Sequence, residues 1–176
     1  DSANCTQFGA DHFYRQTAER FGDYELRAMC DFKGSPILVV NTAARCGFTR
    51  QYSGLVELDE DFQDQGLVIL GFLSNDFGNQ GGTDEEVERC NRDFQITFEQ
   101  FSTVGVTPNS QDGLHPVFEW LTSQSGLEGP IQWNFNKFLV DRSGALINRW
   151  EGSTEPNSGE IRAAIEAVLS ESGEGN

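Results

Sequence analysis

Two short apolar runs with a helix-like pattern between them constrain the fold of this chain more than any other feature. Residues Pro36–Asn41 and Leu67–Phe72 are mainly apolar and rich in branched side chains, which is typical of strands buried on both faces of a parallel sheet. Between these runs, apolar side chains recur at helical spacing, and Gly66 is expected to end that helix. Strand, helix and strand in this order predict a βαβ unit with a right-handed crossover.

The remaining patterns complete an α/β domain. Thr83 and Glu86 form a capping-box pattern that predicts an inserted helix, and a short helix is expected after His115. Further predicted elements are strands at 138–140 and 146–150, joined by a turn at 141–144, and a last helix capped by Asn157 or Ser158. This order predicts a thioredoxin-like fold: a central mixed sheet flanked by helices, with the inserted helix between the βαβ and ββα halves.

The length of 176 residues suits one domain. We expect residues 1–32 to form an N-terminal extension of loops or short helices, and residues 171–176 to form a frayed tail. The formal charge of −16 argues against binding to nucleic acid or to anionic membranes. No apolar run approaches the ~20 residues that span a bilayer. The four cysteines are widely spaced and the chain has two histidines, so we expect no metal site.

Cys46 falls in the turn after the first predicted strand. That turn lies beyond the carboxyl ends of parallel strands, where α/β folds place ligands. The N–H groups at the start of the next helix favour a thiolate, and Arg45 and Arg50 add positive charge, so we expect a lowered thiol pKa. On position alone, a small buried core residue is an equally good interpretation of Cys46.

A lowered pKa alone does not make a fast peroxidase, because the nucleophilicity of a thiolate falls together with its pKa. As the O–O bond breaks, the departing oxygen gains negative charge, which hydrogen-bond donors must stabilise. Neutral N–H donors from Gln, Asn or Trp side chains suit this role because they act without ionising.

Three segments resemble the motifs of the glutathione peroxidase family, in its cysteine-containing, thioredoxin-dependent bacterial type. Residues 41–49 (Asn-Thr-Ala-Ala-Arg-Cys-Gly-Phe-Thr) resemble the nucleophile motif, residues 71–80 the second motif, and residues 133–138 (Trp-Asn-Phe-Asn-Lys-Phe) the third. The similarity runs from about Lys33 to Val168, and three motifs in order are specific where any one would be weak. The resemblance implies a thiol peroxidase that reduces hydrogen peroxide and small organic hydroperoxides without a cofactor.

The resemblance also assigns roles to residues. It implies that Cys46 is the catalytic nucleophile and that Gln80, Trp133 and Asn134 are the neutral donors around it. Cys90 resembles the resolving cysteine, which would form a Cys46–Cys90 disulfide, and we expect these two residues to lie far apart in the reduced protein. The alternative for Cys90 is a packed core cysteine, because it shares a helix face with apolar neighbours.

The second motif departs from the common family pattern. Leu73 and Ser74 replace Pro and Cys, Asp76 replaces Gln, and Gly81-Gly82 replaces Glu-Pro. Losing a proline and gaining two glycines predicts a looser loop around Gln80.

Cys5 and Cys30 resemble the additional cysteines of exported relatives, which implies a structural disulfide and a periplasmic or secreted protein. Two unpaired thiols in a reducing cytosol are the alternative. The implied reductant is a thioredoxin-type dithiol protein, with glutathione as a second candidate. The short connection from Ser123 to Ile131 lacks the insertion that tetrameric members use, so we expect a monomer. Two other functions stay open: a thiol–disulfide oxidoreductase of the same fold, disfavoured because Thr49 interrupts a C-x-x-C motif, and a non-catalytic peroxide sensor.

Overall fold

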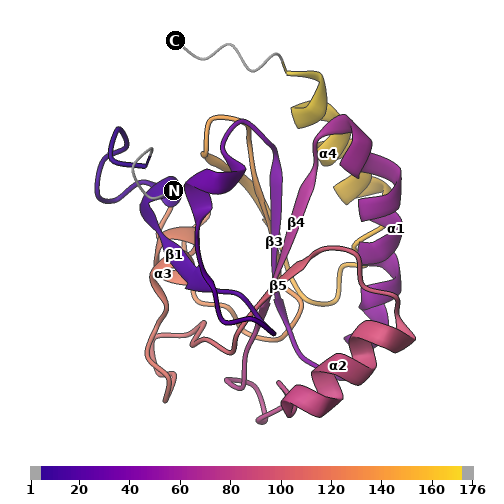
Figure 1. Cartoon of the computed structure of the whole chain (residues 1–176). Coiled ribbons are helices and arrows are strands. Elements are labelled where there is room, and N and C mark those ends of the chain that lie inside the picture. The colour runs from indigo at the N-terminus through magenta and orange to yellow at the C-terminus, as the bar shows by residue number, and fades with distance from the viewer. Residues whose placement is uncertain (1–4, 172–176) are drawn as a thin grey trace.

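A five-stranded mixed sheet forms the centre of the protein in the computed structural model, which describes residues 5–171 (Figure 1). The strand order is β5-β4-β3-β6-β7, and a separate hairpin pairs β1 with β2. The strands are β1 Thr17–Glu19, β2 Leu26–Ala28, β3 Ile37–Thr42, β4 Val68–Leu73, β5 Glu99–Phe101, β6 Lys137–Val140 and β7 Leu146–Trp150. Strand β3 pairs in parallel with β4 and antiparallel with β6, which confirms the predicted βαβ unit and the mixed sheet.

Helices cover both faces of this sheet. They are α1 Tyr52–Phe62, α2 Asp84–Asp93, α3 Pro116–Leu121 and α4 Gly159–Ser170, with 3₁₀ turns at Phe13–Arg15, Met29–Phe32, Thr49–Gln51 and Gln63–Gln65. Helices α1 and α4 lie on one side, whereas α3 and the N-terminal segment lie on the other (Figure 1). The predicted caps are confirmed: Thr83 and Glu86 form a capping box on α2, and Ser158 caps α4.

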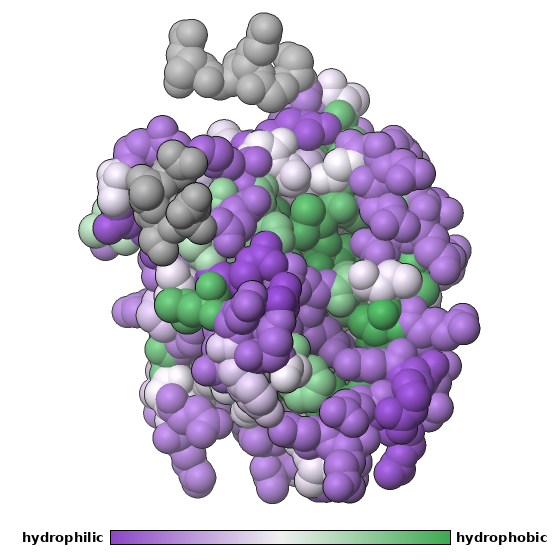
Figure 2. All heavy atoms as spheres, viewed as in Figure 1, coloured by the Kyte–Doolittle hydropathy of each residue, from purple (hydrophilic) through white to green (hydrophobic). Residues whose placement is uncertain are grey.

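Each side of the sheet has its own hydrophobic core. One core joins the N-terminal segment and α3 to the sheet residues that point toward them, with Phe72 stacked on Phe101. The other joins α1 and α4 to the opposite face and includes Tyr52, Phe135 and Cys46. Hydrophilic side chains cover most of the outer surface seen in Figure 2, as the charge of the chain requires. No helix within residues 5–171 is long and apolar enough to cross a membrane.

The N-terminal segment differs from the expected loops and short helices. It contains the β1–β2 hairpin as well as two 3₁₀ turns, and β5 was also not predicted. Strands β1, β2 and β5 are each three residues long and contain polar or charged residues. Such short segments show too little alternation of apolar and polar residues to predict a strand. A disulfide joins Cys5 and Cys30, whose Cα atoms lie 5.7 Å apart, as the resemblance implied. Most of the expected frayed tail, residues 172–176, lies outside the described residues.

The topology brings four distant segments to one end of the sheet. The chain leaves β3 and β4 at their carboxyl ends, which are adjacent because these strands are parallel. Strand β6 begins at the same end because it runs antiparallel to β3, with Lys137 paired to Val40. Strand β7 ends there too, since Trp150 is opposite Lys137. The segments that follow β3, β4 and β7, and the one that precedes β6, therefore surround one place.

Candidate active site

Cys46 lies in the turn after β3, and the start of the next helix fixes its position. The backbone N–H of Cys46 donates to Thr49 Oγ1 at 3.0 Å, and the same hydroxyl donates to the Ala43 carbonyl at 2.7 Å. The Phe48 N–H donates to Cys46 Sγ at 3.3 Å. Only 8% of Cys46 is exposed, and it is a free thiol. The turn therefore aims a backbone donor at the sulfur, as the helix-start argument predicts for a nucleophile in this place.

The loop that carries Gln80 is pinned to the Cys46 turn by its backbone. The Arg45 N–H donates to the Gln80 carbonyl at 3.0 Å, and the Ala44 N–H donates to the Gly81 carbonyl at 3.2 Å. A Cβ at Gly81 would lie 2.8 Å from the Ser74 carbonyl oxygen, and one at Gly82, where φ is +91°, would lie 2.9 Å from the Ala44 Cβ. The two glycines permit this close approach between the Gln80 loop and the Cys46 turn, and the looser loop stays a prediction.

Asn134 joins the Gln80 side chain directly. Asn134 Nδ2 donates to Gln80 Oε1 at 3.0 Å, and Asn134 is fully buried. The Oδ1 of Asn134 is also buried and has no hydrogen-bond partner among the described residues. A buried acceptor without a partner is unusual and marks a place where a further donor would be stabilised.

Asn41, at the end of β3, holds the segment that contains Trp133 and Asn134. Its Nδ2 donates to the Trp133 carbonyl at 3.1 Å, and its Oδ1 accepts from the Asn136 N–H at 2.9 Å. Its own carbonyl accepts from the Phe135 N–H at 2.7 Å, and Phe135 has a φ of 62°, which closes the turn tightly. We did not single out Asn41 as a site residue from the sequence, although it opens the first motif.

Trp133 lies between this cluster and solvent. It is 43% exposed, and its ring centroid is 5.6 Å from that of Phe77. Within residues 5–171, the recorded hydrogen bond to Cys46 Sγ comes from the Phe48 N–H, and none comes from the side chains of Gln80, Trp133 or Asn134. The structure thus joins Gln80 and Asn134 and places Trp133 next to Asn134. The sulfur of Cys46 is bonded to a backbone N–H at the start of the next helix, as the sequence predicts.

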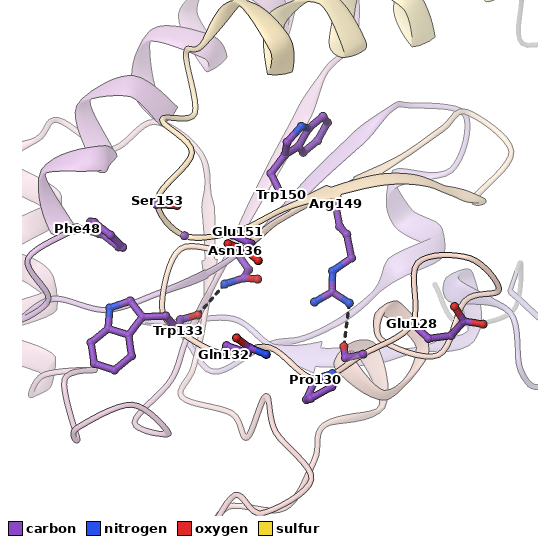
Figure 3. A pocket seen from close by; sticks show the side chains of 12 residues that line it. Phe48, Glu128, Pro130, Gln132, Trp133, Asn136, Arg149, Trp150, Glu151 and Ser153 are labelled. Atoms are coloured by element: carbon purple, nitrogen blue, oxygen red, sulfur yellow. Dashed lines mark hydrogen bonds between the residues drawn. The ribbon is translucent and has the colours of Figure 1, made fainter.

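A pocket of about 700 Å³ opens beside this cluster (Figure 3). Phe48 and Trp133 stand on one side of it, and Arg149 lies on the other with its guanidinium group turned toward the Gly129 carbonyl. The remaining lining residues are Glu128, Gly129, Pro130, Gln132, Asn136, Trp150, Glu151, Gly152 and Ser153. Since Phe48 donates to the sulfur through its backbone and lines the pocket, the pocket adjoins the Cys46 turn.

The two arginines near Cys46 have partners of their own. Arg45 Nε lies 2.7 Å from Glu86 Oε2, and Arg50 pairs with Glu155 at 3.2 Å. Arg45 lowers the pKa of Glu86, which also takes part in the capping box of α2. The expected positive surroundings of Cys46 are therefore partly compensated by two carboxylates, and Arg45 connects the Cys46 turn to α2.

Helix α2 presents Cys90 to the Cys46 turn. Cys90 Sγ lies 3.7 Å from the Ala44 carbonyl oxygen, two residues before Cys46. Both cysteines are free thiols, so no disulfide joins them in this structure. Burial raises the pKa of the Cys90 thiol, and Asp93 acts in the same direction. Val87 is the buried residue of this otherwise polar helix, so few apolar contacts hold α2 to the domain.

The sequence predicts no metal site in this protein. Within residues 5–171, no group of three or more His, Cys, Asp or Glu side chains is placed to hold a metal ion. The two histidines cap short helical elements: His12 Nδ1 accepts from the Tyr14 N–H and His115 Nδ1 from the Val117 N–H. Both therefore have local structural roles away from Cys46.

Comparisons with known proteins agree with the geometry. Residues 13–122 match the family model described as glutathione peroxidase. The chain is 42% identical over 162 residues to a glutathione peroxidase of Lactococcus lactis, covering 90% of this chain and 99% of that protein. The chain belongs to the glutathione peroxidase family. It is a thiol peroxidase.

Other relatives support this membership of the glutathione peroxidase family. The chain is 41% identical over 163 residues to the glutathione peroxidase-like peroxiredoxin gpx1 of Schizosaccharomyces pombe, covering 90% of this chain and 99% of that one. The crystal structure of Trgpx in its apo form matches with a TM-score of 0.72 and 31% identity, over 93% of this chain and 98% of that chain. A thioredoxin family protein from Chlorobium tepidum, at 17% identity and a TM-score of 0.62 over 88% and 96% of the two chains, shows the thioredoxin-like fold.

Proposed function

We propose that Cys46 is the peroxidatic residue and that Gln80, Trp133 and Asn134 assist it. The Cys46 thiolate attacks one oxygen of the hydroperoxide, so that an S–O bond forms while the O–O bond breaks. The second oxygen leaves with the electron pair of that bond and takes up a proton, which yields an alcohol or water. Cys46 is oxidised to a sulfenic acid. The observation that carries this proposal is the junction of the Cys46 turn, the Gln80 loop and the Asn134 side chain at one end of the sheet.

The neutral amides have complementary tasks in this step. The unpartnered Oδ1 of Asn134 accepts a hydrogen bond from the peroxide or the thiol, while the Phe48 N–H stabilises the thiolate. The Gln80 amide, aligned by Asn134, and the Trp133 indole donate to the leaving oxygen as it gains charge. The pocket beside Phe48 and Trp133 holds the organic part of the hydroperoxide.

Cys90 resolves the sulfenic acid in the second step. Its thiol displaces hydroxide from Cys46, so that a Cys46–Cys90 disulfide forms and water leaves. Cys90 contacts the backbone just before Cys46, and α2 buries one residue, Val87. Partial opening of α2 therefore frees Cys90 and also lowers the pKa of its thiol, since burial is the largest cause of the raised pKa.

A thioredoxin-type dithiol protein then reduces the disulfide and returns both thiols. The similarity to a peroxiredoxin-named relative supports a dithiol donor over glutathione. The Cys5–Cys30 disulfide supports an oxidising, periplasmic or secreted location. We propose a monomer, because the 123–131 connection is short. The protein then acts in the defence of such a compartment against peroxides.

Steady-state assays with thioredoxin and with glutathione test this proposal. Wild-type protein is expected to turn over hydrogen peroxide with thioredoxin, whereas Cys90→Ser consumes one peroxide per molecule and then stops. Peptide mapping of oxidised protein under non-reducing conditions should yield a Cys46–Cys90 peptide. A Cys90→Ser variant with full thioredoxin-supported turnover would remove Cys90 from the mechanism. Stoichiometric oxidation of the wild type without turnover would favour a sensor instead.

A further inference from the structure

Lys137 is a fully buried lysine at the end of the sheet where the active site lies. It is the first residue of β6, and its side chain has 0% exposure. Its Nζ donates to Gln51 Oε1 at 2.6 Å, to the Gly152 carbonyl at 3.2 Å and to the Thr154 carbonyl. An ammonium group has three N–H donors, so the three acceptors use its full donor capacity.

This lysine has no carboxylate partner. Within residues 5–171, no ion pair includes Lys137, and the charged group that acts on it is Glu155, which is itself paired with Arg50. Burial lowers the pKa of Lys137 to about 7, and Glu155 acts in the opposite direction. A lysine is rarely buried without an ion-pair partner, because the desolvation of its charge is costly.

The three acceptors belong to two segments that shape the active site. Gln51 ends the 3₁₀ turn that follows Cys46, and its Nε2 also donates to the Gly152 carbonyl at 2.7 Å. Gly152 and Thr154 lie in the segment after β7. The Lys137 side chain therefore connects the start of α1, the segment after β7, and the strand that follows Trp133 and Asn134.

Gly152 transmits this connection to the catalytic residues. A Cβ at Gly152 would lie 2.2 Å from the Asn134 carbonyl oxygen and 3.4 Å from the Phe48 ring, so the backbone of Gly152 packs directly on both. Asn134 aligns Gln80, and Phe48 donates its N–H to Cys46 Sγ. The segment after β7 also forms part of the wall of the pocket in Figure 3, through Gly152 and Ser153.

We propose that Lys137 is a positioning residue for peroxide reduction: its buried ammonium group holds Gly152 against Asn134 and Phe48, and thereby keeps the donors aligned on Cys46. The proposal rests on the proposed role of Cys46. The protonated form fits this task because a neutral amine has two N–H donors for three acceptors, so one of the three acceptors loses its Lys137 donor when Lys137 releases its proton. The alignment of the donors on Cys46 is therefore best below about pH 7, and it weakens as the pH rises through that value.

The test compares two reactions of the same thiol. In a Cys90→Ser background, the rate constants of Cys46 with hydrogen peroxide and with iodoacetamide are measured from about pH 6 to about pH 9. Both reactions need the thiolate, but only the peroxide reaction needs donors for a leaving oxygen, so their ratio is independent of the thiolate fraction. We expect this ratio to fall with rising pH in the wild type. In Lys137→Met we expect it to be about tenfold lower at pH 6 and nearly independent of pH.

Lys33→Met is the matched control, since Lys33 is the other lysine of the chain and is exposed. It should leave the ratio and its pH dependence unchanged. If circular dichroism shows that Lys137→Met does not fold, Gln51→Glu replaces it, because a carboxylate beside the ammonium group raises its pKa and should move the fall in the ratio to higher pH. A folded Lys137→Met with the wild-type ratio at every pH overturns the proposal, as does an unshifted profile in Gln51→Glu. If Cys46→Ser still reduces peroxide, the proposed function fails instead.

Discussion

Gln80 and Asn134 are 54 residues apart in the sequence, yet a hydrogen bond of 3.0 Å joins their side-chain amides. This bond uses one Asn134 N–H and leaves the Asn134 Oδ1 without a partner among the described residues. Two uncharged amides are thus oriented by each other beside the turn that carries Cys46. Neutral donors in a fixed orientation stabilise a developing oxyanion without reorganising during the reaction.

Gln80→Glu should slow the oxidation of Cys46 by hydrogen peroxide by about 10²–10³. The change preserves the size of the side chain but replaces its N–H donor with a negative charge beside the leaving oxygen. Stopped-flow measurement of peroxide consumption by reduced protein checks the value. Gln111→Glu, on an exposed loop, adds the same charge elsewhere and should leave the rate constant unchanged. Equal rates for the two variants would exclude Gln80 from the donor set.

Thr83→Ala should accelerate the formation of the Cys46–Cys90 disulfide. Thr83 caps α2, and loss of such a cap costs about 1 kcal/mol of helix stability, which is about fivefold in an opening equilibrium. Rapid-quench oxidation followed by non-reducing mass spectrometry gives the rate. Ser158→Ala removes the equivalent cap from α4 and should not change the rate of disulfide formation. A slower rate in Thr83→Ala would show that Cys90 reacts from the intact helix.

The Cys5–Cys30 disulfide should stabilise the fold without affecting the reaction. Its removal in a Cys5→Ser/Cys30→Ser variant is expected to lower the free energy of unfolding by about 2–4 kcal/mol, because the bond closes a segment with a sequence separation of 25. Urea denaturation of the variant and the wild type measures this loss in the free energy of unfolding. The rate constant of Cys46 with peroxide should stay within twofold of the wild type, since both cysteines belong to the core on the opposite side of the sheet from Cys46.

Lys137 should make the stability of the protein depend on pH in a specific window. Burial lowers its pKa in the folded state to about 7, whereas the unfolded state retains the ordinary value of about 10.5. Between these values the unfolded state binds more protons, so the free energy of unfolding contributed by this residue rises with pH. Urea denaturation from pH 6 to 10 should show that rise in the wild type and a flatter profile in Lys137→Met. Identical profiles would mean that Lys137 titrates normally.

The sequence predicts the strong elements of this fold because they carry local signals. The apolar runs of β3 and β4, the spacing along α1 and the capping box of α2 each specify their element without tertiary contacts. The β1–β2 hairpin and β5 are three-residue strands whose pairing depends on partners elsewhere, so no local pattern indicates them.

The candidate site is predictable in its residue types but not in its contacts. The motifs indicate Cys46, Gln80, Trp133 and Asn134, and the helix-start argument indicates a backbone donor near Cys46 without specifying the N–H of Phe48. In the loop around Gln80, glycine indicates flexibility in the sequence, and the structure adds that Gly82 leaves room for the close approach of Ala44. The buried state of Lys137 was equally invisible, since lysine at the start of a strand normally points to solvent.

The role of Cys46 is tested most directly by single-turnover peroxide consumption in the absence of any reductant. Wild-type protein with Cys46 and Cys90 reduced and the Cys5–Cys30 disulfide intact should consume one equivalent of hydrogen peroxide rapidly, and mass spectrometry should locate the oxidation in a Cys46–Cys90 disulfide. Cys46→Ser should consume none on the same timescale. Rapid consumption by Cys46→Ser, with the oxidation found at Cys90, would contradict the account.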